Sequence, residues 1–121
     1  MELRFEKEAS DVRGTVLFLS YGDKKLNIVE IKQGFSRGGH YHPFNTVHHV
    51  ILGKLECREK NISSGEEKTY IVSAPAVIFI PMMTAHVLTA IEDTLFAEEF
   101  GHNYAATDYP EYRKIVTQKM L

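Results

Sequence analysis

The segment GFSRGGHYH, residues 34–42, places two histidines one residue apart after a glycine-rich run. In a β-strand, residues two positions apart point to the same face, so His40 and His42 project together and Tyr41 points away. A second segment, PMMTAH at residues 81–86, follows an apolar run and delivers His86 from a distant part of the chain. Because neutral imidazole is the commonest metal-ligand group, the two segments predict one site built from these three histidines.

Short runs of β-forming residues surround both segments. They predict eight strands, and most of the turns between them contain Gly, Pro, Asn or Asp, where the backbone reverses at low cost. The predicted strands span residues 15–20, 26–32, 47–52, 54–60, 68–73, 76–80, 85–91 and 94–100. Short strands at near-regular spacing, with no helix between them, favour a β-sandwich or barrel. Residues 34–39 are expected to form a turn.

The C-terminal part of the chain has a different pattern. Residues 108–120 place Tyr112, Ile115 and Val116 close to a helical stripe. Pro110 suits the first turn of a helix, and Asp108 is positioned to accept hydrogen bonds as its N-cap. The pattern therefore predicts one short terminal helix that packs on the barrel.

Both histidine segments resemble the paired motifs of the cupin superfamily. The first motif reads Gly-x5-His-x-His-x3,4-Glu-x6-Gly, and the second reads Gly-x5-Pro-x-Gly-x2-His-x3-Asn. The resemblance covers residues 26–100, and the matching residues are Gly34, His40, His42, Gly53, Pro81 and His86. It implies an all-β cupin (jelly-roll) barrel with a short C-terminal helix, in a single domain of residues 1–121.

The sequence departs from this family pattern at the metal-ligand glutamate. Thr46 stands where the family has that Glu, and Met83 replaces the glycine between Pro81 and the histidine of the second motif. Two arrangements then remain open. Either His40, His42 and His86 hold a divalent ion by themselves, or His48, on the same inward face of its strand, supplies a fourth ligand. The expected ion is zinc, iron, manganese or nickel.

The residues just before the first histidine suggest a substrate. Arg37 and the residues after it resemble the Arg-Gly-x-His element of cupins that act on nucleotide-linked sugars. The resemblance implies that a histidine, here His40, takes a proton next to a ketone. Arg37 either holds a phosphate through paired hydrogen bonds or is a solvated loop arginine. Alternation along residues 94–100 places Glu98 and Glu99 on opposite faces but does not choose which one points inward. Either one of them, with Glu98 preferred, faces the barrel and orients a histidine, or both are solvated or paired with lysines.

Three function classes follow from these residues. The first is an isomerase, epimerase or lyase acting on a small carbonyl or sugar compound, with a metal ion that polarises the carbonyl. The second is a three-histidine iron dioxygenase, whose open coordination positions would take oxygen and substrate. The third is a metal-free keto-sugar isomerase or a non-enzymatic ligand-binding cupin.

Composition argues against other classes of partner. The net charge is −2 and the basic residues are scattered, which disfavours nucleic-acid binding. No apolar run is long enough to span a bilayer, and the N-terminus lacks a signal peptide, so we expect a cytoplasmic protein without a membrane partner. Apolar residues on both faces of residues 47–52 predict a homodimer, with a small molecule as the other partner.

Five further side chains receive structural interpretations. His49 is expected to face outward from its strand, and His102 is expected to be structural. The single cysteine, Cys57, is expected to be half-buried on a strand and not catalytic. Tyr104 and Tyr109 either close over the barrel mouth or pack the terminal helix, and the helix-packing interpretation is favoured.

Overall fold

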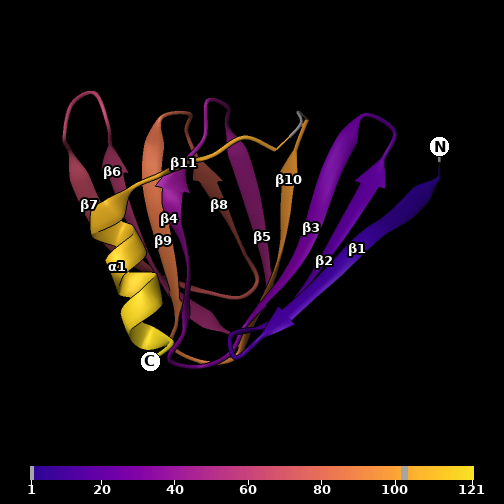
Figure 1. Ribbon diagram of the computed structural model, residues 1–121, viewed down its shortest axis with the longest axis horizontal. Coiled ribbons are helices and arrows are strands. Elements are labelled where there is room, and N and C mark those ends of the chain that lie inside the picture. Colours follow the sequence, from indigo (N-terminus) through magenta and orange to yellow (C-terminus); the bar gives the residue numbers. More distant parts are fainter. Residues whose placement is uncertain (1, 102–103) are drawn as a thin grey trace.

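The computed structural model describes residues 2–101 and 104–121, which form two antiparallel sheets that face each other (Figure 1). The first sheet has the strand order β1 (Leu3–Asp11), β2 (Gly14–Tyr21), β3 (Lys24–Ile31), β10 (Thr94–Phe100), β5 (Thr46–Leu52) and β8 (Ala76–Ile80). The second has the order β11 (Thr107–Asp108), β4 (Ser36–Tyr41), β9 (Thr84–Ala90), β6 (Lys54–Asn61) and β7 (Glu67–Ser73). The predicted all-β jelly-roll architecture is confirmed.

The inner faces of the sheets follow the alternation in the sequence. On β5, Thr46, His48 and Val50 are buried, whereas Val47 and His49 between them are less buried and Ile51 after them is exposed. In Figure 1 the sheets converge at the lower end of the view and spread apart at the upper end. The main apolar cluster joins both sheets, and its most buried members are Ile31, Leu55, Cys57, Ile80, Val50, Phe96 and Leu88. Apolar packing between the inner faces therefore holds the sheets together, and Phe96 brings this cluster into contact with the His48 ring.

The glycine-rich segment differs from its prediction, because residues 36–41 are strand β4 and not a turn. Gly38 and Gly39 have φ values of 108° and 80°, and the pairing of β4 with β9 shifts between Gly38 and His40. A Cβ at Gly38 would lie 2.7 Å from the backbone oxygen of His86. The glycines therefore allow a β-bulge and a close approach of two strands, and this bulge sets the direction of the histidines that follow.

Strand β1 was also missed by the sequence analysis. It pairs with β2 at the edge of the first sheet, yet all nine of its residues are exposed. In its sequence Leu3, Phe5 and Ala9 alternate with polar residues, but Lys7 interrupts the pattern, and neither face of the strand is buried.

The terminal helix α1 spans Pro110–Lys119, inside the predicted residues 108–120. Pro110 lies in the first turn as predicted, but the predicted N-cap is wrong. Tyr109 is the N-cap and makes no side-chain cap, because Asp108 belongs to β11 and pairs with His40 of β4. Tyr112 and Val116 are fully buried and pack with Ala85 and Val87 on the outer face of β9.

Helix α1 is the longest helical element in the described residues. Nothing in that part of the chain is both long and apolar enough to cross a bilayer as a helix.

Candidate metal centre

Three histidines from the two predicted segments meet in space. His40 is the penultimate residue of β4 and pairs with His86 of β9, while His42 directly follows β4. The ring centroids are 4.7 Å apart for His40 and His42, 5.0 Å for His40 and His86, and 5.5 Å for His42 and His86. Each ring offers one nitrogen, and these nitrogens all lie within 4.8 Å of one another. This spacing suits three ligands that share one ion.

Backbone carbonyls orient two of these rings. His42 Nδ1 lies 2.7 Å from the oxygen of Ala105, and His86 Nδ1 lies 3.1 Å from the oxygen of Thr84. A carbonyl accepts hydrogen bonds only, so each Nδ1 carries the proton and each Nε2 keeps a free lone pair. His42 Nε2 is buried and has no hydrogen-bond partner. The donor set therefore fits a metal ion, because an unpartnered buried lone pair is costly unless a ligand satisfies it.

Burial keeps the three imidazoles neutral. Burial is the main reason that the pKa of His40 is lowered to about 3 and that of His86 to about 4, and the neighbouring imidazoles contribute to both shifts. Burial also lowers the pKa of His42, although the hydrogen bond to Ala105 opposes the shift. Near neutral pH all three rings are uncharged, which is the form that binds a metal ion.

The second motif keeps its backbone geometry despite the change of residue. Met83 has a φ of 56°, in the left-handed region where the family motif has glycine. Its N–H donates to the oxygen of His42 at 2.8 Å. The loop before β9 is thus tied directly to the residue after β4, which brings the two histidine segments together.

His48 and Thr46 lie beside the three histidines on β5. The His48 ring centroid is 5.9 Å from that of His86, and its Nε2 is 3.8 Å from Oε2 of Glu98. In the part of the chain that the structure describes, the set of close nitrogens does not include His48. His48 Nδ1 and Thr46 Oγ1 are buried without hydrogen-bond partners. A ligand role for His48 therefore stays a prediction.

Glu98 and Glu99 lie on opposite faces of β10, as their alternation predicts. Glu98 lines the inner cavity, and burial raises its pKa to about 7. Glu99 contacts Lys24 and His49 on the outer face. A carboxyl group with a pKa near neutrality can both accept and return a proton, so Glu98 is suited to acid–base chemistry.

A cavity of ≈ 760 Å³ extends from the histidines between the sheets. Its walls combine apolar side chains such as Phe96 and Leu88 with polar and charged groups. Arg37 lines it from β4 and donates from Nε to the oxygen of Glu30 at 3.0 Å and from Nη2 to the oxygen of Gly14 at 3.1 Å. Arg37 is therefore half-buried and fixed in direction, unlike a solvated loop arginine.

The two tyrosines after β10 have different positions. The Tyr104 ring centroid lies 5.5 Å from that of His42 and 6.4 Å from that of His40, and Tyr104 lines the cavity. The Tyr109 ring instead packs edge-on against Tyr112 of α1, with 5.0 Å between centroids. Tyr104 therefore lies over the histidine site, and Tyr109 packs the terminal helix. His102, expected to be structural, lies outside the described residues.

Comparison with known proteins finds solved structures of similar fold. No family model and no curated protein matches this sequence. A structure of CapF with the inhibitor 3-isopropenyl-tropolone aligns with a TM-score of 0.73 and 21% identity, over 82% of this chain and 31% of CapF. Two structures of oxalate decarboxylase, one named as that of Bacillus subtilis, align at 0.75 with 21% and 22% identity, over 85% of this chain and 30% of theirs.

These neighbours are cupin-fold proteins. The chain has the cupin fold. It spans about a third of the length of the solved proteins that it resembles.

Two residues of this cupin site were missed by the sequence analysis. Glu59 of β6 pairs with His86 of β9, is only 4% exposed and accepts a hydrogen bond from the Tyr70 hydroxyl. Its parity with Leu55 and Cys57 in residues 54–60 is the signal that would have placed it inside. Arg113 of α1 lines the cavity, and no sequence signal could have placed it there.

Cys57 is fully buried, not half-buried as predicted, and takes part in the Glu59 cluster. Its Sγ lies 3.8 Å from Oε2 of Glu59. Burial raises the pKa of its thiol to about 12, so the thiolate that a nucleophile requires is not populated near neutral pH.

Proposed function

We propose that this cupin-fold chain binds one divalent metal ion through His40, His42 and His86. We further propose that it catalyses isomerisation, epimerisation or cleavage of a small carbonyl or sugar compound in the cavity. The observation that carries the proposal is the convergence of three neutral imidazole nitrogens, with the buried lone pair of His42 left without a protein partner.

The residues around the histidines have distinct parts in this proposal. A divalent ion, when bound, supplies a Lewis acid that polarises a carbonyl oxygen. Glu98, with its pKa near 7, takes a proton from the carbon next to the carbonyl and returns it to the same or another atom. Arg37 binds an anionic group of the substrate, and the ring of Tyr104 shields the histidines from solvent.

The ligand and the activity of the structural neighbours support a reaction on a small oxygen-rich compound. One neighbour is a decarboxylase of oxalate with Mn(II) centres, and another binds a tropolone inhibitor. Oxalate and tropolone both present two adjacent oxygen atoms, which an ion with open coordination positions can bind together. A nucleotide-linked substrate, suggested by the sequence around Arg37, is a narrower form of this proposal.

Metal analysis tests the first part of the proposal. Purified protein dialysed against zinc, manganese or iron should retain about one ion per chain, measured by mass spectrometry of the elements. His49 is exposed on the outer face of β5, so His49→Ala is a matched control that should keep the ion, whereas His42→Ala should lose it. Equal metal content in both variants would contradict the assigned site.

Ligand screening tests the second part. Thermal shifts with nucleotide sugars, small dicarboxylates and diketones should identify a binding class, since a ligand at 100 times its Kd adds about 2.7 kcal/mol to stability. Turnover is then followed by proton exchange at the substrate carbon in D₂O. Tight binding without exchange, isomerisation or cleavage would favour the non-enzymatic cupin instead.

A second candidate function is a three-histidine iron dioxygenase. The observation that favours it is that the close ligand set of the described residues contains three histidines and no carboxylate, with Thr46 in the position of the family glutamate. Iron-loaded protein would then consume oxygen with small diketones or thiols in an oxygen electrode. Stoichiometric substrate conversion without oxygen consumption would exclude it.

We also propose that the protein is a homodimer. Ile51 of β5 and Val77 and Phe79 of β8 are between 48% and 65% exposed on the outer face of the first sheet. An apolar face of this kind is typical of surfaces that a second subunit covers. Light scattering should give twice the chain mass, and Phe79→Lys should shift it to the monomer mass.

A further inference from the structure

We propose that Arg113 of the terminal helix is a substrate-binding residue, which holds an oxyanion group, carboxylate or phosphate, together with Arg37. The inference rests on the proposed function, because it assigns the substrate class of the same cavity. It adds a residue from outside the two histidine segments.

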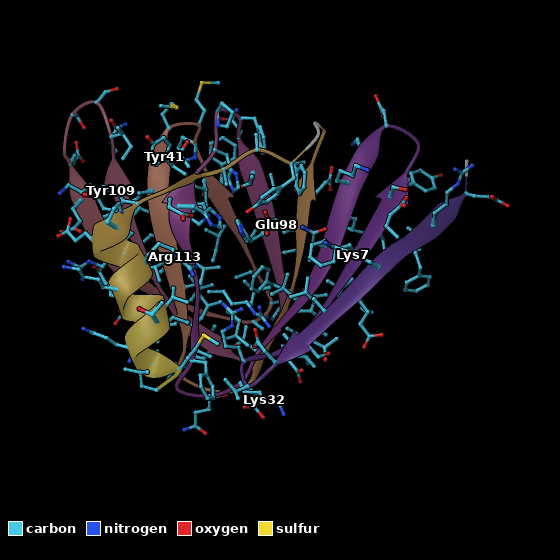
Figure 2. The ribbon with its side chains drawn as sticks, in the orientation of Figure 1. Lys7, Lys32, Tyr41, Glu98, Tyr109 and Arg113 are labelled. Carbon is cyan, nitrogen blue, oxygen red and sulfur yellow. The ribbon has the colours of Figure 1, made fainter. Side chains whose placement is uncertain are left out.

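The packing of α1 on β4 brings Arg113 to the cavity. Gly39 has no Cβ, and one built there would lie 2.7 Å from Cδ and 2.9 Å from the backbone nitrogen of Arg113. The N–H of Tyr109 donates to the oxygen of Gly39 at 2.8 Å, and Tyr112 is buried on the same helix. Figure 2 shows Arg113 where α1 meets β4. The helix can approach this closely because position 39 is glycine.

Hydrogen bonding fixes the guanidinium but does not neutralise it. Nη1 of Arg113 donates to the oxygen of Gly38 at 2.9 Å, and Arg37 also donates to backbone carbonyls. Among the residues that the structure describes, neither arginine forms an ion pair with a carboxylate. Both are half-buried and line the cavity with His40. An incoming oxyanion would supply the direct ion-pair partner that both guanidinium groups lack, in a partly desolvated site.

The charge of the cavity wall agrees with an anionic ligand. The chain carries a net charge of −2, yet more basic than acidic side chains line the cavity. The basic ones are Lys7, Arg13, Lys25, Arg37 and Arg113, and the acidic ones are Glu6, Glu98 and Asp108. Arg13 is paired with Asp11, whereas the ion pairs of the described residues include neither Arg37 nor Arg113, and Arg113 is close enough to His40 to act on its charge.

The test compares two neighbouring cations on one helix. Arg113→Gln and Lys114→Gln each remove one positive charge, but Lys114 is exposed and does not line the cavity. Calorimetric titration of malonate and of inorganic phosphate into metal-free and zinc-loaded protein gives the affinities. We expect Arg113→Gln to weaken binding of the preferred anion at least tenfold and Lys114→Gln to change it less than twofold.

A second variant separates ligand binding from a structural role. Arg113→Lys keeps the charge without the forked geometry, so it should bind the anion with intermediate affinity and a steeper salt dependence. If Arg113 only ties α1 to β4, Arg113→Gln lowers the Tm of the ligand-free protein while the affinity stays at the wild-type value. That result, or failure of both anions to bind wild-type protein at 10 mM, overturns the inference. Retained zinc would show that the metal site itself stands.

Discussion

The two ends of the barrel bury side chains of opposite chemistry. At the closed end, Ile31 and Leu55 are fully buried among aliphatic and aromatic neighbours. At the open end, His42 and His48 are 2% exposed, yet each keeps a ring nitrogen without a hydrogen-bond partner. Apolar burial stabilises the fold, whereas unpartnered buried polar atoms destabilise it. The stabilisation from apolar burial at the closed end therefore offsets the destabilising effect of the unpartnered polar atoms at the open end.

The position of the unpartnered atoms makes this difference informative. In the described residues, the buried side-chain nitrogen and oxygen atoms without a partner are His42 Nε2, His48 Nδ1 and Thr46 Oγ1. All three belong to residues 42–48, around the proposed metal site. Native structures keep such atoms rare, and their concentration at one end is typical of a site that awaits a ligand.

The largest expected effect is at the open end. His86→Ala removes one of three metal ligands, so metal affinity should fall by more than the ~10–100-fold typical of losing an outer-shell partner. Competition with a chromophoric chelator measures the affinity, and His49→Ala is the control. An unchanged affinity in His86→Ala would remove the functional distinction between the two ends.

At the closed end, a truncation should act on stability alone. Leu55→Ala leaves a cavity in the apolar cluster and should lower the free energy of unfolding by about 2–5 kcal/mol. Urea denaturation measures the loss, and metal affinity of the folded protein should stay within twofold of wild type. Loss of metal binding in folded Leu55→Ala would show that the two ends are coupled.

A smaller effect depends on pH through Glu98. Its pKa is raised from 4.5 to about 7 by burial, so the folded state prefers the protonated form. This contribution to stability is full below pH 4.5 and is lost as pH rises through 7, by at most about 3 kcal/mol. Metal-free Glu98→Gln should therefore gain stability relative to wild type between pH 5 and pH 8. A pH-independent difference would contradict the raised pKa; exposed Glu99→Gln is the control.

The smallest effect is expected at Thr46. Thr46→Val keeps the shape of the side chain and removes a buried hydroxyl that has no hydrogen-bond partner. The free energy of unfolding should rise by about 1 kcal/mol, with metal affinity unchanged. Chemical denaturation and metal titration check the two parts. A loss of stability would mean that the Thr46 hydroxyl has a hydrogen-bond partner in solution, and that the open end destabilises the fold less than the unpartnered atoms suggest.

Much of the fold followed from local patterns. Alternation on β5 correctly assigned His48 inward and His49 outward, and the same argument separated Glu98 from Glu99. Pro110 marked the first turn of α1. These inferences succeeded because the period of side-chain direction in a strand, and the fixed φ of proline, are properties of the chain itself.

The sequence by itself determined that His40 and His42 share one face of a strand, because alternation is a local property, and the resemblance to the paired cupin motifs implied that His86 joins them. The tertiary structure alone decided that residues 36–41 are a strand, since the bulge at Gly38 depends on the approach of β9. It also decided the placement of Arg113, which follows from the packing of α1 on β4. Contacts between distant segments set burial, and burial sets both the pKa of Glu98 and the unpartnered nitrogen of His42.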